Sequence, residues 1–336
     1  MAHSPRARAG LAALLAAAGL SASLPAEAAP STTFRIEVHA VATLTLTRPQ
    51  TLTASFAGAP LATIAGELRL PAGAPPKMPA VLMLHGDAGA IANQVAWIEA
   101  LNGLGIAVFT LDSFTGRGAI APEDSVASMP DSVGGIARVI DAERALAVLA
   151  RHPRIDPQRI AVMGFSSGAN TVLVAAQTRF ASAFGSAGTG FAAYIALYPD
   201  CNVQLIDDTR TEPGLQRIFI GEADVLTSAA TCKRYEKRLK LAGVDIAVTT
   251  FPGAHHGFDN VANPDLIHIA DVPTGAACNR EERVRGELVN VDTGRPLTLR
   301  DACIGHGLVA GYDAAADAAT KAAVKALLIE RFGLKR

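Results

Sequence analysis

Short apolar runs separated by helical stretches constrain the fold of this 336-residue chain more than any other feature. Runs of this kind are typical of strands that are buried on both faces of a parallel sheet. The runs are Pro79–Leu84, Gly105–Leu111, Arg159–Met163, Ala192–Leu197, Gln216–Ile220 and Asp245–Phe251. Helical patterns alternate with them at Asn93–Asn102, Val133–Arg151, Ser167–Thr178, Ser228–Leu241 and Ala314–Arg331. The alternation predicts an α/β fold with a mostly parallel central sheet and helices on both faces.

Two earlier segments have a different pattern. Phe34–Val41 and Ala62–Leu70 alternate apolar and polar residues, as half-buried antiparallel strands do. The Pro- and Gly-rich stretch 71–76 is expected to be a loop rather than a domain boundary, because the sheet pattern continues beyond it. We therefore expect one catalytic domain over residues 29–336.

The composition excludes several classes of protein. Half of the residues are hydrophobic and the net charge is −1, which fits a large core and argues against disorder. The 30 Lys and Arg residues are balanced by 31 Asp and Glu residues without a basic block, so no nucleic-acid partner is expected. After the N-terminus no apolar run reaches the length of a membrane span.

The first residues are typical of an export signal. Arg6 and Arg8 precede the apolar run Leu11–Leu20, and Ala26-Glu27-Ala28 offers small residues at a cleavage site. We expect a signal peptide over residues 1–28 and a periplasmic or extracellular protein of bacterial type. The alternative is a buried N-terminal helix.

The four cysteines fit export. Cys201, Cys232, Cys278 and Cys303 form no C-x-x-C pair and have no histidine at zinc-finger spacing, so no metal site is expected. An even number in an oxidising compartment predicts two disulfides with three possible connectivities. If the strands ending at Leu197 and Ile220 are neighbours, Cys201 and Cys232 lie within bridging distance, which leaves Cys278 to pair with Cys303.

Gly164-Phe165-Ser166-Ser167-Gly168 has the G-x-S-x-G pattern of a nucleophile elbow. It follows an apolar strand and precedes a helical pattern, which is the context the motif requires. Ser166 is therefore the candidate nucleophile, and Ser167 lacks the flanking glycine pair. The alternative is a turn in which Ser166 only caps the helix.

A serine nucleophile needs a base and an orienting carboxylate, in the chain order Ser, acid, His. Asp224 follows the strand Gln216–Ile220 and is the expected acid, with Glu222 as a rival and helix capping as its alternative role. The base is expected after the last strand, where His255 and His256 are equivalent on chemical grounds.

Backbone N–H groups are expected to form the oxyanion hole. One is that of Ser167, directly after the nucleophile. The other is that of Asp87, in the glycine-containing loop His85–Gly89. For His85 we expect a buried loop histidine held by backbone hydrogen bonds.

Together these residues resemble the dienelactone hydrolase family of α/β hydrolases. The resemblance also includes Leu111–Gly118 and Leu197–Cys201, and it runs from about residue 55 to 260. It implies Ser166, Asp224 and His256 as the triad, because Gly257-Phe258 selects the second histidine. Because of two departures the lactone substrate does not carry over: Ser166 stands where dienelactone hydrolase has a cysteine, and Gly86 where it has a glutamate.

The resemblance to exported members of the family implies a hydrolase of carboxylic esters that needs no cofactor. The stretch that contains Arg117 also resembles these exported members, and Arg117 is a candidate to bind a substrate carboxylate. The alternative is that Arg117 holds its own loop in place through hydrogen bonds. A peptidase, amidase or acyltransferase could use the same triad, and a non-catalytic binding protein could keep the same fold. We expect a small-molecule ester as the partner, and the sequence does not indicate an oligomeric state.

The segment Asp259–Tyr312 is an insertion between the histidine loop and the last helix. It is much longer than an ordinary connection and lacks strong periodicity. We expect a flap that determines substrate selectivity and is stapled by Cys278 and Cys303. The alternative is a surface excursion without a role in catalysis.

Overall fold

The computed structural model describes residues 33–89, 92–119 and 134–335. The chain divides after Ser31 into two units, and the sheet and helices belong to the second, residues 32–336. The expected signal peptide lies outside the described residues. Within the described part, no helix is long and apolar enough to cross a membrane.

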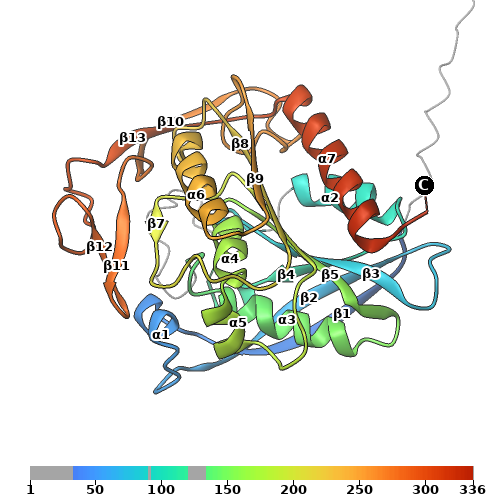
Figure 1. Ribbon diagram of the computed structural model, residues 1–336. Coiled ribbons are helices and arrows are strands. Elements are labelled where there is room, and N and C mark those ends of the chain that lie inside the picture. The colour runs from blue at the N-terminus through green and yellow to red at the C-terminus, as the bar shows by residue number, and fades with distance from the viewer. Residues whose placement is uncertain (1–32, 90–91, 120–133, 336) are drawn as a thin grey trace, which may run out of the picture. The chain divides into compact units, whose positions relative to one another are not determined.

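An eight-stranded sheet forms the centre of the second unit (Figure 1). The strands lie in the order β1 (Thr33–Leu44), β2 (Leu61–Pro71), β4 (Ala107–Asp112), β3 (Met78–Leu84), β5 (Ile155–Phe165), β6 (Ala193–Leu197), β8 (Leu215–Gly221) and β9 (Ile246–Phe251). β2 pairs antiparallel with β1 and with β4, and all the other pairs are parallel. The expected mostly parallel sheet with an antiparallel start is confirmed, and residues 71–76 connect two of its strands.

Helices cover both faces of the sheet. α2 (Ala92–Asn102) and α7 (Ala314–Phe332) pack together on one face, and α3 (Val139–Arg151), α4 (Ser167–Ala175), α5 (Thr178–Phe184) and α6 (Ala229–Leu241) lie on the other (Figure 1). The short helices α1 (Arg48–Thr53) and η1 (Thr115–Arg117) were not expected. α1 has a capping box, in which the side chains of Thr47 and Gln50 each bond to the other residue's backbone N–H.

The helix predicted over Ser167–Thr178 ends earlier than expected. α4 ends at Ala175, and α5 starts at Thr178 after an extended Gln177. Backbone bonds hold the break open: the N–H of Glu212 donates to the carbonyl of Ala176, and that of Thr178 to the carbonyl of Arg210. These partners are distant in the sequence, so local helix propensity does not reveal the break.

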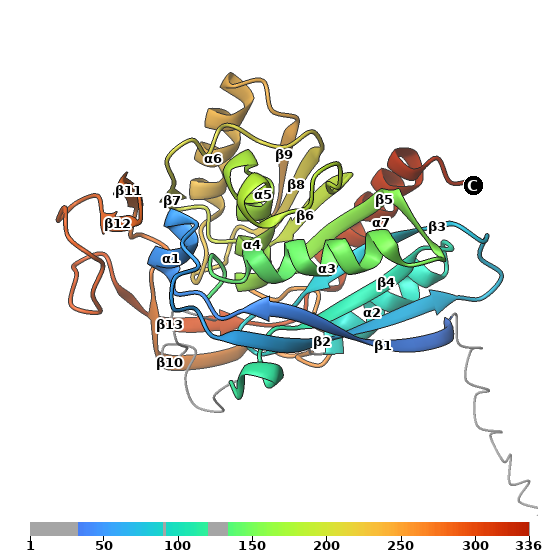
Figure 2. The same cartoon turned by 90° about the horizontal axis from the view of Figure 1, so that it is seen from below.

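The segment Asp259–Tyr312, whose sequence lacks strong periodicity, contains four strands. β10 (Ile267–Thr274) and β13 (Gly305–Ala310) form a two-stranded ribbon. β11 (Arg280–Val284) lies between β12 (Glu287–Asn290) and β7 (Val203–Gln204) in a three-stranded sheet. Figure 2 shows both groups beside the main sheet. The Cys278–Cys303 bridge joins the two halves of the segment, and a Cys201–Cys232 bridge joins the loop after β6 to α6. Both predicted pairings are confirmed.

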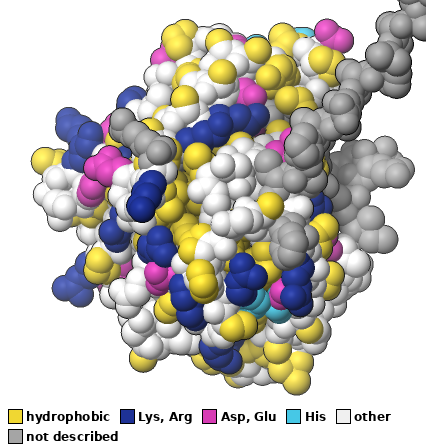
Figure 3. All heavy atoms as spheres, turned by 90° about the vertical axis from the view of Figure 1, so that its right-hand side faces the viewer, with side chains coloured by type: hydrophobic (Ala, Val, Ile, Leu, Met, Phe, Trp, Pro, Cys, Tyr) yellow, Lys and Arg dark blue, Asp and Glu magenta, His cyan; other side chains and the backbone are white. Residues whose placement is uncertain are grey.

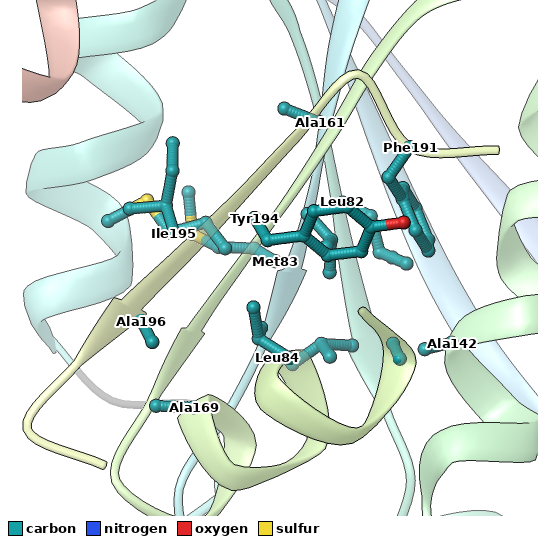
Figure 4. Packing of buried hydrophobic residues seen from close by; sticks show 14 of the residues in the cluster. Leu82, Met83, Leu84, Ala142, Ala161, Ala169, Phe191, Tyr194, Ile195 and Ala196 are labelled. Atoms are coloured by element: carbon teal, nitrogen blue, oxygen red, sulfur yellow. The ribbon is translucent and has the colours of Figure 1, made fainter. Parts of the chain in front are cut away.

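The core lies between the sheet and its helices. β3 is buried over its whole length, and Leu82, Met83 and Leu84 pack among residues of β5, β6 and α4 (Figure 4). On the surface that Figure 3 shows, basic side chains lie among acidic and apolar ones. The buried centre of the sheet supports the loops that leave the carboxyl ends of its parallel strands.

Candidate active site

Ser166 lies at the turn between β5 and α4. Its φ of 51° and ψ of −121° are unusual for a residue with a side chain, and its N–H donates to the carbonyl of Leu197 at 3.0 Å. The Ser166 side chain makes no capping hydrogen bond to α4. The interpretation of Ser166 as a mere helix cap is therefore not supported, and the hydroxyl is free to face the pocket.

The turn requires glycine at both motif positions because α4, β3 and β5 approach one another closely. A Cβ on Gly164 would lie 2.3 Å from the carbonyl oxygen of Gly168. A Cβ on Gly168 would lie 2.3 Å from the carbonyl oxygen of Leu84 and 2.5 Å from that of His85. Real side chains do not tolerate such distances, so the spacing of the glycines follows from packing.

The structure brings Ser166, His256 and Asp224 together. Asp224 follows β8 and His256 follows β9, at the same edge of the parallel sheet where β5 ends. His256 Nε2 lies 3.0 Å from Ser166 Oγ, and His256 Nδ1 lies 2.8 Å from Asp224 Oδ2. The spacing allows a proton to pass from the serine to the imidazole while the carboxylate orients the ring.

Asp224 is held as a carboxylate in a buried position. Its Oδ1 accepts the N–H groups of Leu226 and Thr227, and its Oδ2 accepts the Thr227 hydroxyl at 2.7 Å. Burial alone would raise the pKa of Asp224, but the charge and hydrogen bond of His256 and the bonds from Thr227 lower it below its usual value. The carboxylate therefore stays ionised beside the histidine at neutral pH.

The residues considered as alternatives to Asp224, His256 and Ser166 make other contacts. Glu222 accepts a hydrogen bond from the Thr250 hydroxyl at 2.7 Å. His256, not His255, makes both of the bonds that join the serine to the aspartate. Ser167 uses its hydroxyl as a donor to Asp87 Oδ1 at 2.5 Å, so it does not compete with Ser166 for the histidine.

His85 is a buried loop histidine, as expected. Its Nε2 accepts the N–H of Ser113 at 3.1 Å, and its Nδ1 donates to the carbonyl of Gly86 at 2.7 Å. Burial lowers the pKa of His85 to about 4, with the charge of Arg138 acting in the same direction. The neutral ring thus fixes the start of the loop that carries Asp87.

A buried arginine links the two residues whose N–H groups are the oxyanion-hole candidates. Arg138 donates to the carbonyl of His85 at 2.9 Å and to Ser167 Oγ at 2.6 Å, and Ser167 in turn donates to Asp87. Sequence reasoning missed Arg138. It lies 29 residues before Ser167 in a segment without a motif, so only the fold shows the contact.

Of the two roles considered for Arg117, substrate binding and tying its own loop, the structure shows the contacts of the second. Its guanidinium makes a bidentate pair with Asp141, at 2.7 and 2.8 Å, and donates to the carbonyls of Leu44 and Ser113 and to the Thr45 hydroxyl. The side chain is only 4% exposed, and these bonds use all five of its N–H groups. Arg117 therefore ties its loop to β1 and α3, which was the alternative role.

A second buried network supports the histidine. The ring of Tyr198 packs edge-on against that of His256, with 4.7 Å between centroids. The Tyr198 hydroxyl donates to Asp259 Oδ1 at 2.7 Å, and Trp97 and Asn93 donate to Asp259 Oδ2. Burial raises the pKa of Asp259 in spite of these three donors. The sequence could have indicated Tyr198 through its position, because this residue directly follows β6 at the edge of the sheet where Ser166 lies.

A pocket of about 470 Å³ opens at Ser166 and His256. One side is formed by the loop His85–Gly89 with Asn93 and Gln94 of α2, and another by Leu226. The remaining wall comes from the insertion, which contributes residues 262–263 and Leu308 and Ala310 of β13. Residues of the insertion therefore line the pocket, and their influence on substrate selectivity stays a prediction.

A mostly parallel sheet with a serine elbow, a following acid and a final histidine at one edge defines an α/β hydrolase. The model of the dienelactone hydrolase family matches residues 64–286, two thirds of the chain, and the chain belongs to that family. It is therefore a hydrolase. No curated protein matches the chain.

Solved structures agree on the fold. A dienelactone hydrolase-like promiscuous phosphotriesterase from metagenomic libraries superposes with a TM-score of 0.53 at 18% identity, over 88% of this chain and 98% of the other. A structure named m3DLH gives 0.54, also at 18% identity and with the same coverage. At this identity the likeness establishes the α/β-hydrolase fold, and the substrate has to be argued from the residues of the site.

Proposed function

We propose that the protein is a serine hydrolase of carboxylic esters. The observation that carries the proposal is the line of hydrogen bonds from Ser166 through His256 to Asp224 at the mouth of a pocket. Ser166 Oγ attacks the ester carbonyl while His256 Nε2 takes its proton. The protonated imidazole then gives that proton to the departing alcohol, which leaves an acyl group on Ser166. Water, deprotonated by His256, attacks the acyl carbon and releases the acid.

The negative charge that develops on the carbonyl oxygen needs donors. The N–H of Ser167 lies in the first turn of α4, where helical amides have no partner within the helix and the helix dipole favours an anion. The N–H of Asp87 is the second donor that we propose. The link from Arg138 through the Ser167 hydroxyl to Asp87 supports this pair, because it fixes both donors relative to each other.

Replacement of Ser166 by alanine tests the nucleophile. Ser166→Ala should reduce the hydrolysis of p-nitrophenyl acetate by several orders of magnitude with the fold intact, because members of a triad act as a unit. His255→Ala is the matched control and should keep turnover within a fewfold of wild type. Near-full turnover by Ser166→Ala, or a loss confined to His255→Ala, would contradict the mechanism.

A panel of acyl donors and acceptors distinguishes an ester hydrolase from an amidase or an acyltransferase with the same triad. We expect p-nitrophenyl esters to be cleaved much faster than the matched anilides, and water to be the acceptor even with added alcohols. Faster cleavage of anilides or peptides would indicate an amidase, and ester products from the alcohols would indicate an acyltransferase.

We also propose that the protein is exported. Two disulfides among the described residues suit an oxidising compartment, and the first 28 residues have the pattern of a cleaved leader. Expression of the full chain in a bacterium followed by N-terminal sequencing should give a mature protein that begins at Ala29. Ala28→Leu should block this cleavage, and a full-length wild-type product in the cytosol would contradict export.

A further inference from the structure

The apolar wall of the pocket continues onto an exposed surface of the insertion. β13 passes directly beside the proposed base, since the N–H of Gly311 donates to the carbonyl of His256 at 3.2 Å. Leu308 and Ala310 of this strand line the pocket. The pocket therefore has one wall that is a strand of the β10–β13 ribbon.

The register of the ribbon shows which residues extend that wall. Ile267 pairs with Ala310 and Ile269 pairs with Leu308 in the antiparallel ladder. Directly paired residues project from the same face of a sheet, so the two isoleucines lie on the face that lines the pocket. Ile267 is 40% exposed and Ile269 is 46% exposed. A continuous apolar strip thus leads from the pocket toward solvent.

The charges around the pocket limit what this strip accepts. Among the described residues that line the pocket there is no lysine or arginine. The one carboxylate, Asp87, already accepts the Ser167 hydroxyl. A carboxylate on the substrate chain would lose its water here and meet only neutral donors such as the side-chain amide of Gln94, without a positive charge to offset the loss, which is unfavourable.

We infer, on the basis of the proposed esterase function, that the enzyme acts on esters with an extended, uncharged, apolar chain. The ester group lies at Ser166, and the chain runs over Leu308 and Ala310 and out along Ile267 and Ile269. This subsite also accounts for the exposure of two isoleucines beside a catalytic pocket, since apolar surface of that kind is typical of binding sites.

The test compares chain lengths in matched variants. In the wild-type enzyme, kcat/KM should rise from p-nitrophenyl acetate through butyrate and hexanoate to octanoate, by about threefold to fourfold for each methylene that is buried. The p-nitrophenyl monoester of adipic acid has the length of the hexanoate and a terminal carboxylate. It should react at least about tenfold more slowly than the hexanoate, because its carboxylate is desolvated without meeting a positive charge.

Ile267→Thr/Ile269→Thr makes the strip polar and keeps the β-branched shape that suits a strand. This double variant should lose about tenfold in kcat/KM for the octanoate and stay within about twofold of wild type for the acetate. Ile36→Thr/Val38→Thr is the control, because these residues are exposed on one face of edge strand β1, which contributes nothing to the pocket. It should leave the chain-length series unchanged.

The outcomes separate the inference from the function on which it rests. Wild-type turnover of the acetate no faster than that of Ser166→Ala would overturn both. Turnover of the acetate with a flat series, a preference for the adipate ester, or an unchanged series in Ile267→Thr/Ile269→Thr would overturn the subsite alone. Conversion of a dimer to a monomer by that variant, with the series unchanged, would instead assign the strip to contact with a second copy of the chain.

Discussion

Ser167 takes part in the site in two ways, through its N–H and through its hydroxyl. The N–H is a proposed donor to the oxyanion, while the hydroxyl lies between Arg138 and Asp87. The hydroxyl thus contributes to the position of two N–H donors without touching substrate. A group that acts in this way should influence the transition state more than substrate binding.

Ser167→Ala removes the hydroxyl and keeps the N–H, so it isolates this role. We expect kcat for p-nitrophenyl acetate to fall about tenfold with little change in KM, because the oxyanion forms only in the transition state. Ser186, which is exposed in the turn after α5, provides the control Ser186→Ala with wild-type kinetics. An increase of KM at constant kcat would instead show that the hydroxyl assists ground-state binding.

Glu143 on α3 gives the protein a pH-dependent stability. Burial, together with the charge of Glu212, raises the pKa of Glu143 from 4.5 to about 8. The folded state therefore keeps a proton that the unfolded state releases between pH 4.5 and 8. The contribution of this group is present in full below pH 4.5, is lost as the pH rises to about 8, and is constant above that.

Glu143→Gln should remove this dependence. The free energy of unfolding, measured with urea at a series of pH values from about 5 to about 8, should fall with pH more steeply in wild type than in the variant. The difference between the two slopes is at most about 1.4 kcal/mol per pH unit. Equal slopes would show that Glu143 is ionised in the folded protein.

Ser166, Asp224 and the histidine pair could be predicted to lie together because each follows an apolar strand at one edge of the sheet, and the family resemblance selected His256. The contacts of Arg117 and Arg138 could not be predicted. Arg117 lies in a stretch that resembles family members, yet its partner Asp141 lies on α3, 24 residues later. Buried ion pairs depend on which loops the fold brings together, and neither arginine has a sequence pattern that shows its partner.

At the scale of elements, the elbow depends on how closely α4 crosses the ends of β3 and β5. The main-chain oxygens of Leu84 and His85 occupy the space where a side chain on Gly168 would begin. The helix therefore approaches the strands at a distance that only glycine permits, and this approach sets the direction of its N-terminal amides.

Gly168→Ala should destabilise the protein by about 3 kcal/mol or prevent it from folding, because α4 must move away from β3. Gly190 is the matched control, since a Cβ there meets nothing within 4 Å and its backbone is not in the left-handed region. Gly190→Ala should change the free energy of unfolding by less than about 1 kcal/mol. Urea denaturation measures both, and similar losses in the two variants would contradict the packing model.

The elements of the sheet could be predicted, whereas those of the insertion could not. Strands buried on both faces are continuous apolar runs, and β3 and β6 were found in this way. β10 is exposed over most of its length, so burial imposes no regular pattern on its residues. The break between α4 and α5 is likewise held by backbone bonds from a distant segment.

At the scale of the whole molecule, the Cys201–Cys232 bridge ties the end of β6 to α6 across 31 residues. Both sulfurs lie in the hydrophobic core, and Cys232 is fully buried. The bridge thus restricts the unfolded chain over the stretch that contains β8 and Asp224. It stabilises the half of the sheet from which Asp224 and His256 extend.

Cys201→Ala/Cys232→Ala should lower the free energy of unfolding by about 3–4 kcal/mol, the loop-closure value for a segment of this length. A reductant should cause a comparable loss in wild type and in Cys278→Ala/Cys303→Ala, and a smaller one in the Cys201 and Cys232 variant. Thermal melts with and without the reductant measure this. An unchanged wild-type melting temperature under reduction would contradict the stabilising role.

The insertion leaves the catalytic unit and returns to it at almost the same point. The N–H of Tyr312 donates to the carbonyl of Asn263 at 2.8 Å, and that of Asp313 donates to the carbonyl of Phe258. A segment whose two ends are one hydrogen bond apart can be exchanged for another of different length without a change in the spacing of its anchors. A change in the length of this segment can therefore leave its anchors in place, but a foreign ribbon grafted between Asn263 and Tyr312 must supply its own partners for β7 and for the carbonyl of His256.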